Sequence, residues 1–379
     1  MRSSRRGEVD PFIVMDVMEA ARAAEAAGRH IIHMEVGQPG TPAPAGARAA
    51  LAAAMERDAL GYTVALGLPE LRARIARIYA DRHGLDLDPA RVIVTSGSSG
   101  AFLLAFTHLF DAGDRVALGD PGYPSYRQIL RALSLDPVGI PTRIENRLQP
   151  APEDVPQDIQ GLIVASPANP SGTMLDTPAL TALYEAATSR GAAFISDEIY
   201  HGIEYERRAV SALEISDDVT VINSFSKYYS MTGWRVGWMV VPEAHVRGIE
   251  RLAQNMFICP SHAAQVAALA ALDCEAELQA NLAVYAENRR LMIEGLPGAG
   301  FTDVAPPDGA FYVYADVSAF TDDSLAFARR LLDEAGVAAT PGIDFDPVRG
   351  RHTLRFSYAR STEDIAEGLR RLVDFMAKG

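Results

Sequence analysis

One lysine is placed where an amine could do chemistry. Of the 35 lysine and arginine residues, only Lys227 and Lys378 are lysines. Lys227 follows closely on the apolar run VTVIN at 219–223, which predicts a buried strand. An arginine guanidinium keeps its proton, whereas a desolvated lysine can lose its proton and act as a nucleophile. A lysine retained here in an arginine-rich chain indicates a required amine, with a structural lysine as the alternative.

Small residues follow another apolar run and could bind a phosphate group. The run RVIVT at 91–95 is followed by Ser96, Gly97, Ser98 and Ser99, and a helix is predicted directly after them. Free backbone N–H groups at the start of a helix form a common anion site. Ordinary N-capping of the helix by serine also explains such a turn. Both interpretations remain open for this turn.

Two further strand ends carry polar side chains. Asn169 lies in the turn SPANPSG, where flanking prolines could fix the backbone and aim the amide NH₂ at a ligand oxygen. Asp197 follows the run AFIS at 193–196, so its carboxylate is expected to be buried and to need a partner. The partner could be the protonated nitrogen of a heterocyclic ligand. Common turn chemistry for Asn169, and an N-cap or a structural ion pair for Asp197, are the alternatives.

Alternating strands and helices are expected to position these residues. Apolar runs predict strands at 91–95, 115–118, 161–165, 193–196 and 219–223, and helical spacing is found between them at 100–110 and 178–190. This alternation predicts an α/β fold with a largely parallel sheet and helices on both faces. The run at 235–241 follows too soon for a crossover helix, so we expect that strand to be antiparallel. Such sheets bind ligands beyond the carboxyl ends of their strands.

The chain changes character from about Glu275. A long helical stretch begins there, and strand-like runs follow at 310–314 and 353–358. Near the start of the chain, an amphipathic helix at 14–27 precedes the loop VGQPGTPAPAG. We therefore expect an N-terminal arm that forms part of a small domain, a large domain and a small C-terminal domain, at 1–44, 45–280 and 281–379.

Composition limits the possible partners. The 379-residue chain has a formal charge of -14, which disfavours binding to nucleic acid or to an anionic membrane surface. No run approaches the roughly 18 apolar residues of a membrane span. Glu8 and Asp10 interrupt any N-terminal apolar stretch, so we expect no signal peptide and a cytoplasmic location. Cys259 and Cys274 have no paired spacing, so we expect neither a disulfide framework nor a metal site.

Taken in order, the phosphate turn, the amide, the acid, the lysine and a following arginine resemble the class I and II aminotransferases. These are pyridoxal-phosphate enzymes of fold type I, related to aspartate aminotransferase. The most specific segment is SFSKYYSMTGWRVGW, which is similar to the family signature around its lysine and arginine. Further matches are VGQPG, GYTVALGLPELR, DPGYPSY, SPANPSG, SDEIY, PPDGAFY and LRFSYA. The resemblance implies a mostly parallel, seven-stranded sheet between helices in three layers, and a smaller α+β domain formed by both terminal segments.

The resemblance also implies how pyridoxal 5'-phosphate would be bound. Lys227 would hold the cofactor through an imine and later move a proton, and Asp197 would keep the pyridine nitrogen protonated. Tyr200 and Asn169 match residues that hydrogen-bond the phenolic oxygen of the ring, and Tyr123 matches the aromatic residue stacked on its face. The residues that match the phosphate-binding set are Gly97, Ser98, Ser99, Ser224 and Arg235.

Other matched residues would bind the substrate or come from a second chain. Arg355 matches the arginine that grips the substrate α-carboxylate with two parallel hydrogen bonds. A surface charge is the alternative, although its apolar neighbours indicate a strand that is at least half buried. Gly37 and Asn169 would contribute to the same substrate pocket. Tyr62 matches the tyrosine that reaches the phosphate from a partner subunit, so we expect a homodimer with active sites at the subunit interface.

The implied reaction is the transfer of an amino group between an L-amino acid and a 2-oxo acid. Ser99 occupies a turn in which some aspartate-preferring relatives carry a lysine. We therefore expect neutral or broadly varied amino donors, with 2-oxoglutarate or pyruvate as the acceptor. A C–S lyase, or another non-transaminating enzyme on the same fold, is the main alternative. A non-catalytic sensor domain and a dinucleotide-binding enzyme are disfavoured, because neither a DNA-binding segment nor a G-x-G-x-x-G motif after the first strand is found.

Overall fold

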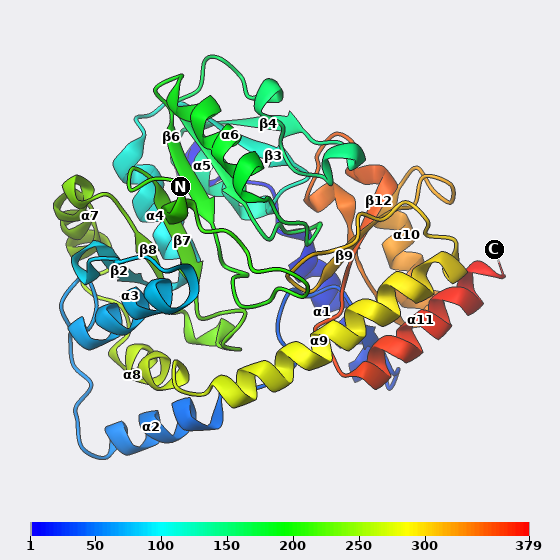
Figure 1. Cartoon of the computed structure of the whole chain (residues 1–379). Coiled ribbons are helices and arrows are strands. Elements are labelled where there is room, and N and C mark those ends of the chain that lie inside the picture. Colours follow the sequence, from blue (N-terminus) through cyan, green and yellow to red (C-terminus); the bar gives the residue numbers. More distant parts are fainter. Residues whose placement is uncertain (1, 379) are drawn as a thin grey trace.

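A seven-stranded sheet organises the larger part of the molecule. The computed structural model describes residues 2–378, and the strands follow the order β2-β8-β7-β6-β5-β3-β4 (Figure 1). Their bounds are Val92–Thr95 (β2), Arg115–Asp120 (β3), Asp136–Pro141 (β4), Gly161–Ala165 (β5), Ala193–Asp197 (β6), Thr220–Ser224 (β7) and Gly237–Val240 (β8). β8 is antiparallel to both of its neighbours, and the other pairs are parallel. The largely parallel sheet and the antiparallel strand expected at 235–241 are confirmed.

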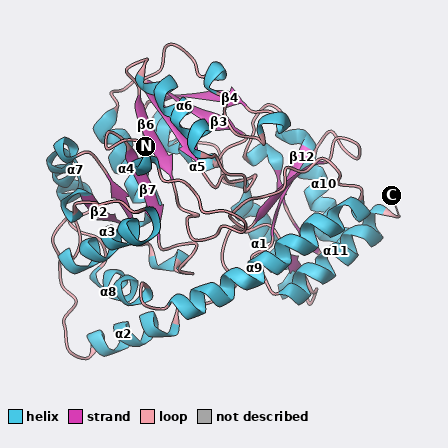
Figure 2. Ribbon diagram, in the orientation of Figure 1, coloured by secondary structure: helices cyan, strands magenta, loops and turns pink. Residues whose placement is uncertain are grey.

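Helices cover both faces of this sheet, because successive strand residues point to opposite sides. In β2, Val92 and Val94 join one hydrophobic core and Ile93 joins the other. The first core is covered by α3 (Pro69–His83), α6 (Thr177–Thr188) and α8 (His262–Ala271). The second is covered by α4 (Gly97–Leu109), α5 (Pro124–Ala132) and α7 (Glu243–Met256). The predicted three-layer arrangement is confirmed (Figure 2).

A smaller unit contains strands and helices around a third core. β9 (Tyr312–Asp316), β11 (Thr340–Pro341) and β12 (Thr353–Ser357) form an antiparallel sheet in the order β11-β12-β9. The helices are α9 (Glu275–Gly295), α10 (Ser324–Arg330) and α11 (Thr362–Met376). Ile32 and Met34 join the same core from the N-terminal part of the chain, and β1 (Ile32–His33) pairs with β10 (Val337–Ala338). α9 runs without interruption through the domain boundary expected after residue 280.

The N-terminal segment connects the two units. Asp10 contacts Arg131 of α5, which lies on the sheet. Three residues later α1 (Ile13–Ala26) begins, and the carboxylate of Asp344 in the smaller unit accepts hydrogen bonds from Ile13 N and Val14 N at 3.2 and 3.3 Å. The chain between these two anchors, which includes Phe12, therefore crosses from one unit to the other. The remaining α-helix among the described residues, α2 (Ala45–Met55), packs against α8.

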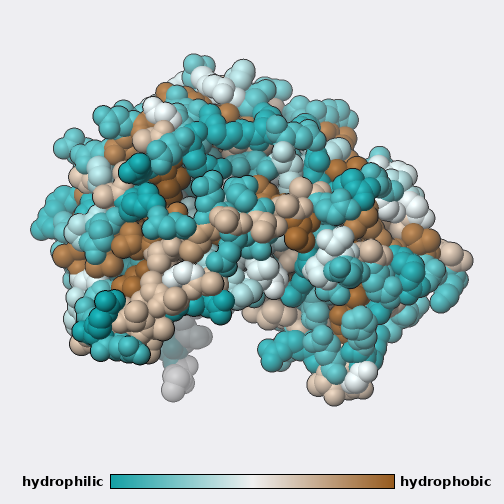
Figure 3. Space-filling view, turned by 60° about the horizontal axis from the view of Figure 1, so that its bottom comes forward, coloured by the Kyte–Doolittle hydropathy of each residue, from teal (hydrophilic) through white to brown (hydrophobic). Residues whose placement is uncertain are grey.

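One face of the molecule is mainly hydrophilic (Figure 3). Figure 3 shows one face on which hydrophilic residues are interrupted by smaller hydrophobic areas. Within residues 2–378, no helix combines the length and the apolar character that a membrane crossing requires.

Candidate active site

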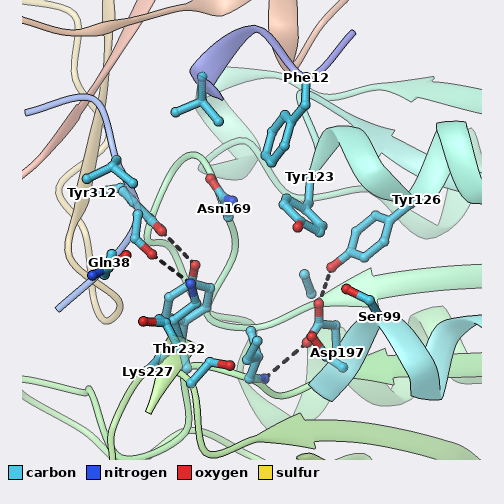
Figure 4. Close-up of a pocket in the computed structure, with 18 of the residues that line it drawn as sticks. Phe12, Gln38, Ser99, Tyr123, Tyr126, Asn169, Asp197, Lys227, Thr232 and Tyr312 are labelled. Atoms are coloured by element: carbon cyan, nitrogen blue, oxygen red, sulfur yellow. Dashed lines mark hydrogen bonds between the residues drawn. The ribbon is translucent and has the colours of Figure 1, made fainter. Parts of the chain in front are cut away.

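A cavity lies where the loops after β2, β5, β6 and β7 converge, and residues from the N-terminal segment and the smaller unit complete its walls (Figure 4). Parallel strands bring their carboxyl ends to one edge of a sheet, so residues far apart in the sequence meet there. The residues predicted from the sequence that line this cavity are Gly37, Ser98, Ser99, Tyr123, Asn169, Asp197, Tyr200, Lys227, Arg235 and Arg355.

Lys227 reaches into the cavity from the loop that follows β7. Its Nζ donates a hydrogen bond to the carbonyl oxygen of Gly37 at 2.6 Å. Burial, together with the positive charges of Arg355 and Arg235, lowers the pKa of Lys227 to about 8, against the opposing effect of Asp197. An amine with this pKa is unprotonated in a useful fraction of molecules near neutral pH, so it can act as a nucleophile or a base.

Asp197 is a buried carboxylate at the end of β6. Burial raises its pKa to about 6, and hydrogen bonds from the Tyr126 hydroxyl and from Ile199 N oppose this effect. Both donors are uncharged, and the hydrogen bond from Tyr126 is drawn in Figure 4. The carboxylate therefore remains largely ionised at pH 7 without a bonded cation. A protonated ring nitrogen of a ligand would supply the missing positive charge.

A group of hydrogen-bond donors surrounds the first turn of α4. Ser98 and Ser99 line the cavity at this helix terminus, and the Ser96 side chain makes no capping hydrogen bond. Gly97 has φ +69, and a Cβ atom added to it would lie 2.5 Å from Nη2 of Arg235. Arg235 itself has φ 54, a left-handed conformation that is costly for a residue other than glycine. The backbone of both residues thus brings a guanidinium against a helix N-terminus, as a phosphate site requires.

Arg355 lies on β12 and lines the cavity from the smaller unit. Its Nη1 donates to Asn169 Oδ1 at 2.9 Å, and its Nη2 donates to the carbonyl oxygen of Glu35 and to Thr340 Oγ1. The side chain is buried, and its Nε has no hydrogen-bond partner among the described residues. Because guanidinium groups only donate, Asn169 turns its oxygen towards Arg355 and leaves its NH₂ for a ligand. The alternative of a surface charge for Arg355 is excluded by its burial.

Tyr200 reaches the cavity from the turn after β6. Its hydroxyl lies 2.7 Å from the hydroxyl of Tyr312 on β9, within hydrogen-bond distance. The hydroxyl of Tyr312 also packs on Gly37, where an added Cβ atom would lie 2.0 Å from it. Gly37 thus allows the N-terminal loop to approach Tyr312 closely, while its carbonyl oxygen contacts Lys227.

Three predicted site residues do not line the cavity of their own chain. Gly97 packs against the guanidinium of Arg235. Ser224 is buried, and its hydroxyl lies 2.9 Å from Ser226 Oγ and 3.1 Å from the carbonyl oxygen of Val236, within hydrogen-bond distance of both. Tyr62 lies in the loop between α2 and α3, where 84% of its surface is exposed. Ser224 therefore acts on this chain's cavity only through its neighbours, and Tyr62 faces solvent.

Three aromatic residues of the cavity had no role assigned from the sequence. Tyr126 and Tyr312 occur in the segments DPGYPSY and PPDGAFY, so the signal was present without an assignment. Phe12 lies just before α1, and its ring packs edge-on against Tyr123 with centroids 5.9 Å apart. Nothing in its local sequence indicates this contact, because it depends on how the N-terminal segment crosses the molecule.

The chain matches known aminotransferases along nearly its whole length. The family model for aminotransferase class I and II matches residues 29–372. Valine–pyruvate aminotransferase of Mycobacterium tuberculosis is 48% identical over 98% of this chain and 97% of its own length. A provisionally named aminotransferase from Silicibacter pomeroyi is 69% identical, with a TM-score of 0.96 over 100% of both chains. Aspartate aminotransferase from Thermus thermophilus is 31% identical, with a TM-score of 0.93 over 99% of this chain and 100% of its own.

The sequence signature, the sheet topology and these relatives all indicate the same family. The chain belongs to the class I and II aminotransferases, transferases that use pyridoxal 5'-phosphate to move an amino group between an amino acid and a 2-oxo acid.

Proposed function

We propose that the cavity holds pyridoxal 5'-phosphate between the first turn of α4 and the end of β6. Arg235, Ser98 and Ser99 offer charged and neutral donors suited to the phosphate, with Gly97 and Ser224 supporting them from behind. Asp197 offers the anion suited to the pyridine nitrogen. The remaining residues proposed to contact the ring are Tyr123, on its face, and Asn169 and Tyr200, at its phenolic oxygen.

The chemistry is proposed to divide between the cofactor and the chain. When bound, pyridoxal 5'-phosphate supplies an aldehyde that takes up amino groups and a ring that accepts electrons from the substrate Cα–H bond. Lys227 Nζ moves the proton at substrate Cα, because its lowered pKa of about 8 leaves it able to accept and return a proton. Asp197 holds a proton on the ring nitrogen, and Arg355 orients the substrate by its α-carboxylate.

We propose neutral, aliphatic amino acids as the preferred donors and pyruvate as an acceptor. Among the described residues that line the cavity, positive charge is carried by Lys227, Arg235 and Arg355 alone, and each of these has a role above. No cation is left for the second carboxylate of aspartate or glutamate, whereas Phe12, Val14 and Met15 offer apolar surface. A relative 48% identical is named valine–pyruvate aminotransferase, which supports this choice.

A donor-by-acceptor activity screen tests this specificity. Valine and alanine should give a higher kcat/KM than aspartate with pyruvate as the acceptor. Valine alone should also convert the bound cofactor to its amine form and release 3-methyl-2-oxobutanoate. Aspartate as the best donor would overturn the specificity, and pyruvate with ammonia or sulfide as the products from an amino acid alone would indicate the lyase alternative.

We also propose that the active form is a homodimer and that Tyr62 completes the partner's site. Tyr62 and nearby Val64 are 84% and 57% exposed in the single chain, so both side chains are accessible to a second chain. Mixing Tyr62→Ala and Lys227→Ala chains offers a test, since only a mixed dimer can combine both intact residues in one site. About a quarter of the wild-type activity is expected from random mixing. Activity no greater than that of either variant alone would contradict a shared site.

The domain division 1–44, 45–280 and 281–379 is part of the same proposal. It is supported by a separate core that joins Ile32 and Met34 to the C-terminal segment. Separate unfolding transitions of the two cores during urea denaturation would support this division, and a single transition reported by all probes would count against it. We further propose a cytoplasmic location. Reducing conditions there keep thiols unpaired, which fits the two free cysteines, Cys259 and Cys274. Cell fractionation tests this location.

A further inference from the structure

The guanidinium of Arg355 lies between two aromatic rings. Its Cζ is 4.4 Å from the ring centroid of Tyr312 and 4.7 Å from that of Phe345. Tyr312 belongs to β9 and Phe345 to the turn after β11, so two separate segments of the smaller unit hold one side chain. A positive guanidinium is attracted to the negative face of an aromatic ring.

These rings add to the stabilisation of the charge on Arg355, which also interacts electrostatically with the carboxylate of Asp344. All three of its hydrogen-bond acceptors are uncharged, namely Asn169 Oδ1, the carbonyl oxygen of Glu35 and Thr340 Oγ1. Only 2% of the surface of Arg355 is exposed, so water contributes little. Stacking also restricts rotation of a long side chain, and a preorganised guanidinium loses less entropy when it binds a carboxylate.

Tyr312 has a second contact that Phe345 lacks. Its hydroxyl lies 2.7 Å from that of Tyr200, and the two rings pack edge to face with centroids 5.6 Å apart. Each hydroxyl has a single hydrogen to donate. If Tyr200 donates its hydrogen to a ligand oxygen, the hydrogen bond between the two tyrosines must be donated by Tyr312. Such a chain of hydroxyls strengthens the bond at its far end.

We propose that Tyr312 is a positioning residue that serves both substrate and cofactor: its ring holds Arg355 for the substrate carboxylate, and its hydroxyl supports the hydrogen bond from Tyr200 to the cofactor. This inference rests on the proposed roles of Arg355 and Tyr200. Phe345 performs the first of the two functions only. Gly37 is part of the arrangement, because any side chain there would displace the Tyr312 hydroxyl.

Three variants separate the two functions in the cofactor-bound protein. Tyr312→Phe removes the hydroxyl and keeps the ring, Phe345→Leu removes one stacked ring, and Tyr312→Leu removes both the ring and the hydroxyl of Tyr312. The first readout is the dissociation constant of 3-methylbutanoate, a monocarboxylate shaped like valine without its amino group. The second is the pH midpoint of the visible absorbance of the bound cofactor, which reports the hydrogen bond at the phenolic oxygen.

The expected results differ between the variants. Phe345→Leu should weaken 3-methylbutanoate binding by roughly fivefold or more and leave the absorbance midpoint unchanged. Tyr312→Phe should leave binding within about twofold and raise the midpoint, because a weaker hydrogen bond from Tyr200 stabilises less negative charge on the phenolic oxygen. Tyr312→Leu should change both. An unchanged midpoint in Tyr312→Phe, or unchanged binding in both leucine variants, would overturn the inference.

Arg355→Leu shows whether the inference or the proposed function has failed. If this variant binds 3-methylbutanoate like the wild type, Arg355 is not the carboxylate site and the proposed function fails with it. If Arg355→Leu loses binding while Phe345→Leu and Tyr312→Leu keep it, only the stacking role is wrong. Thermal melting of each variant identifies a purely structural role, in which Tyr312→Phe and Tyr312→Leu lower the melting temperature and change neither readout. That result would also overturn the inference.

Discussion

Replacing Gly97 by alanine should separate cofactor binding from fold stability. The backbone of Gly97 has φ +69, and the new Cβ atom would lie 2.5 Å from Nη2 of Arg235. The left-handed conformation costs an alanine about 1–2 kcal/mol, which should appear as a lower free energy of unfolding of the cofactor-free chain. The clash should also push the guanidinium away from the start of α4. Loss of its charge-assisted hydrogen bonds to a phosphate costs about 1.5–3 kcal/mol.

The second effect corresponds to a roughly 10- to 100-fold weaker dissociation constant for pyridoxal 5'-phosphate, measurable by absorbance titration. Gly84→Ala is a matched control, since Gly84 has φ +68 at the end of α3 and nothing lies within 4 Å of an added Cβ atom. It should lose a similar free energy of unfolding by urea denaturation and bind the cofactor normally. Normal cofactor affinity in Gly97→Ala, or an equal loss in Gly84→Ala, would refute the reasoning.

Three further substitutions test the central residues. Burial raises the pKa of Asp197 from 3.8 to about 6, so its ionisation destabilises the cofactor-free fold increasingly from about pH 4 to pH 6. Asp197→Asn should abolish turnover yet add roughly 2–3 kcal/mol to the free energy of unfolding at pH 7. An unchanged midpoint of urea denaturation would contradict this. Arg355→Lys should lower kcat/KM about 100-fold for every donor, because an ammonium cannot form the paired hydrogen bonds of a guanidinium. Steady-state kinetics with several donors measure this effect, and a loss confined to one donor would contradict a role of Arg355 in binding the α-carboxylate. Lys227→Ala should abolish turnover and the absorbance of the covalently held cofactor while circular dichroism shows an intact fold, and a normal rate would falsify the assignment.

The main sheet could be predicted because its strands are buried on both faces and read as continuous apolar runs. The strand β4 was not predicted. It lies at the edge of the sheet, contains Pro137, Gly139 and Pro141, and exposes much of its surface, so neither an apolar run nor alternation marks it. The strands of the smaller unit were only partly indicated, since β1, β10 and β11 are two residues long and form through contacts distant in the sequence.

The site residues likewise divide into those whose position follows from local sequence and those whose contacts depend on distant segments. Asn169, Asp197 and Lys227 were predicted to face a ligand because each polar residue follows a strand of a parallel sheet, where local sequence determines position. The contacts of Phe12 and Tyr312 depend on how the terminal segments fold back over that edge. Tyr312 is also buried and apolar in most of its surface, so its sequence context resembles that of any core residue.

Cofactor binding and dimer formation should stabilise each other. Arg235 is exposed in the single chain although its backbone is held in a costly conformation that directs it to the start of α4. Charge-assisted hydrogen bonds at an exposed site compete with water, and they become stronger where a partner's surface excludes it. If Tyr62 of a second chain covers this site, linkage requires that pyridoxal 5'-phosphate lowers the dimer dissociation constant by the same factor by which dimerisation tightens cofactor binding. Sedimentation equilibrium with and without the cofactor should show this shift in the wild type and a smaller one in Tyr62→Ala, and equal shifts in both would mean that Tyr62 does not carry the coupling.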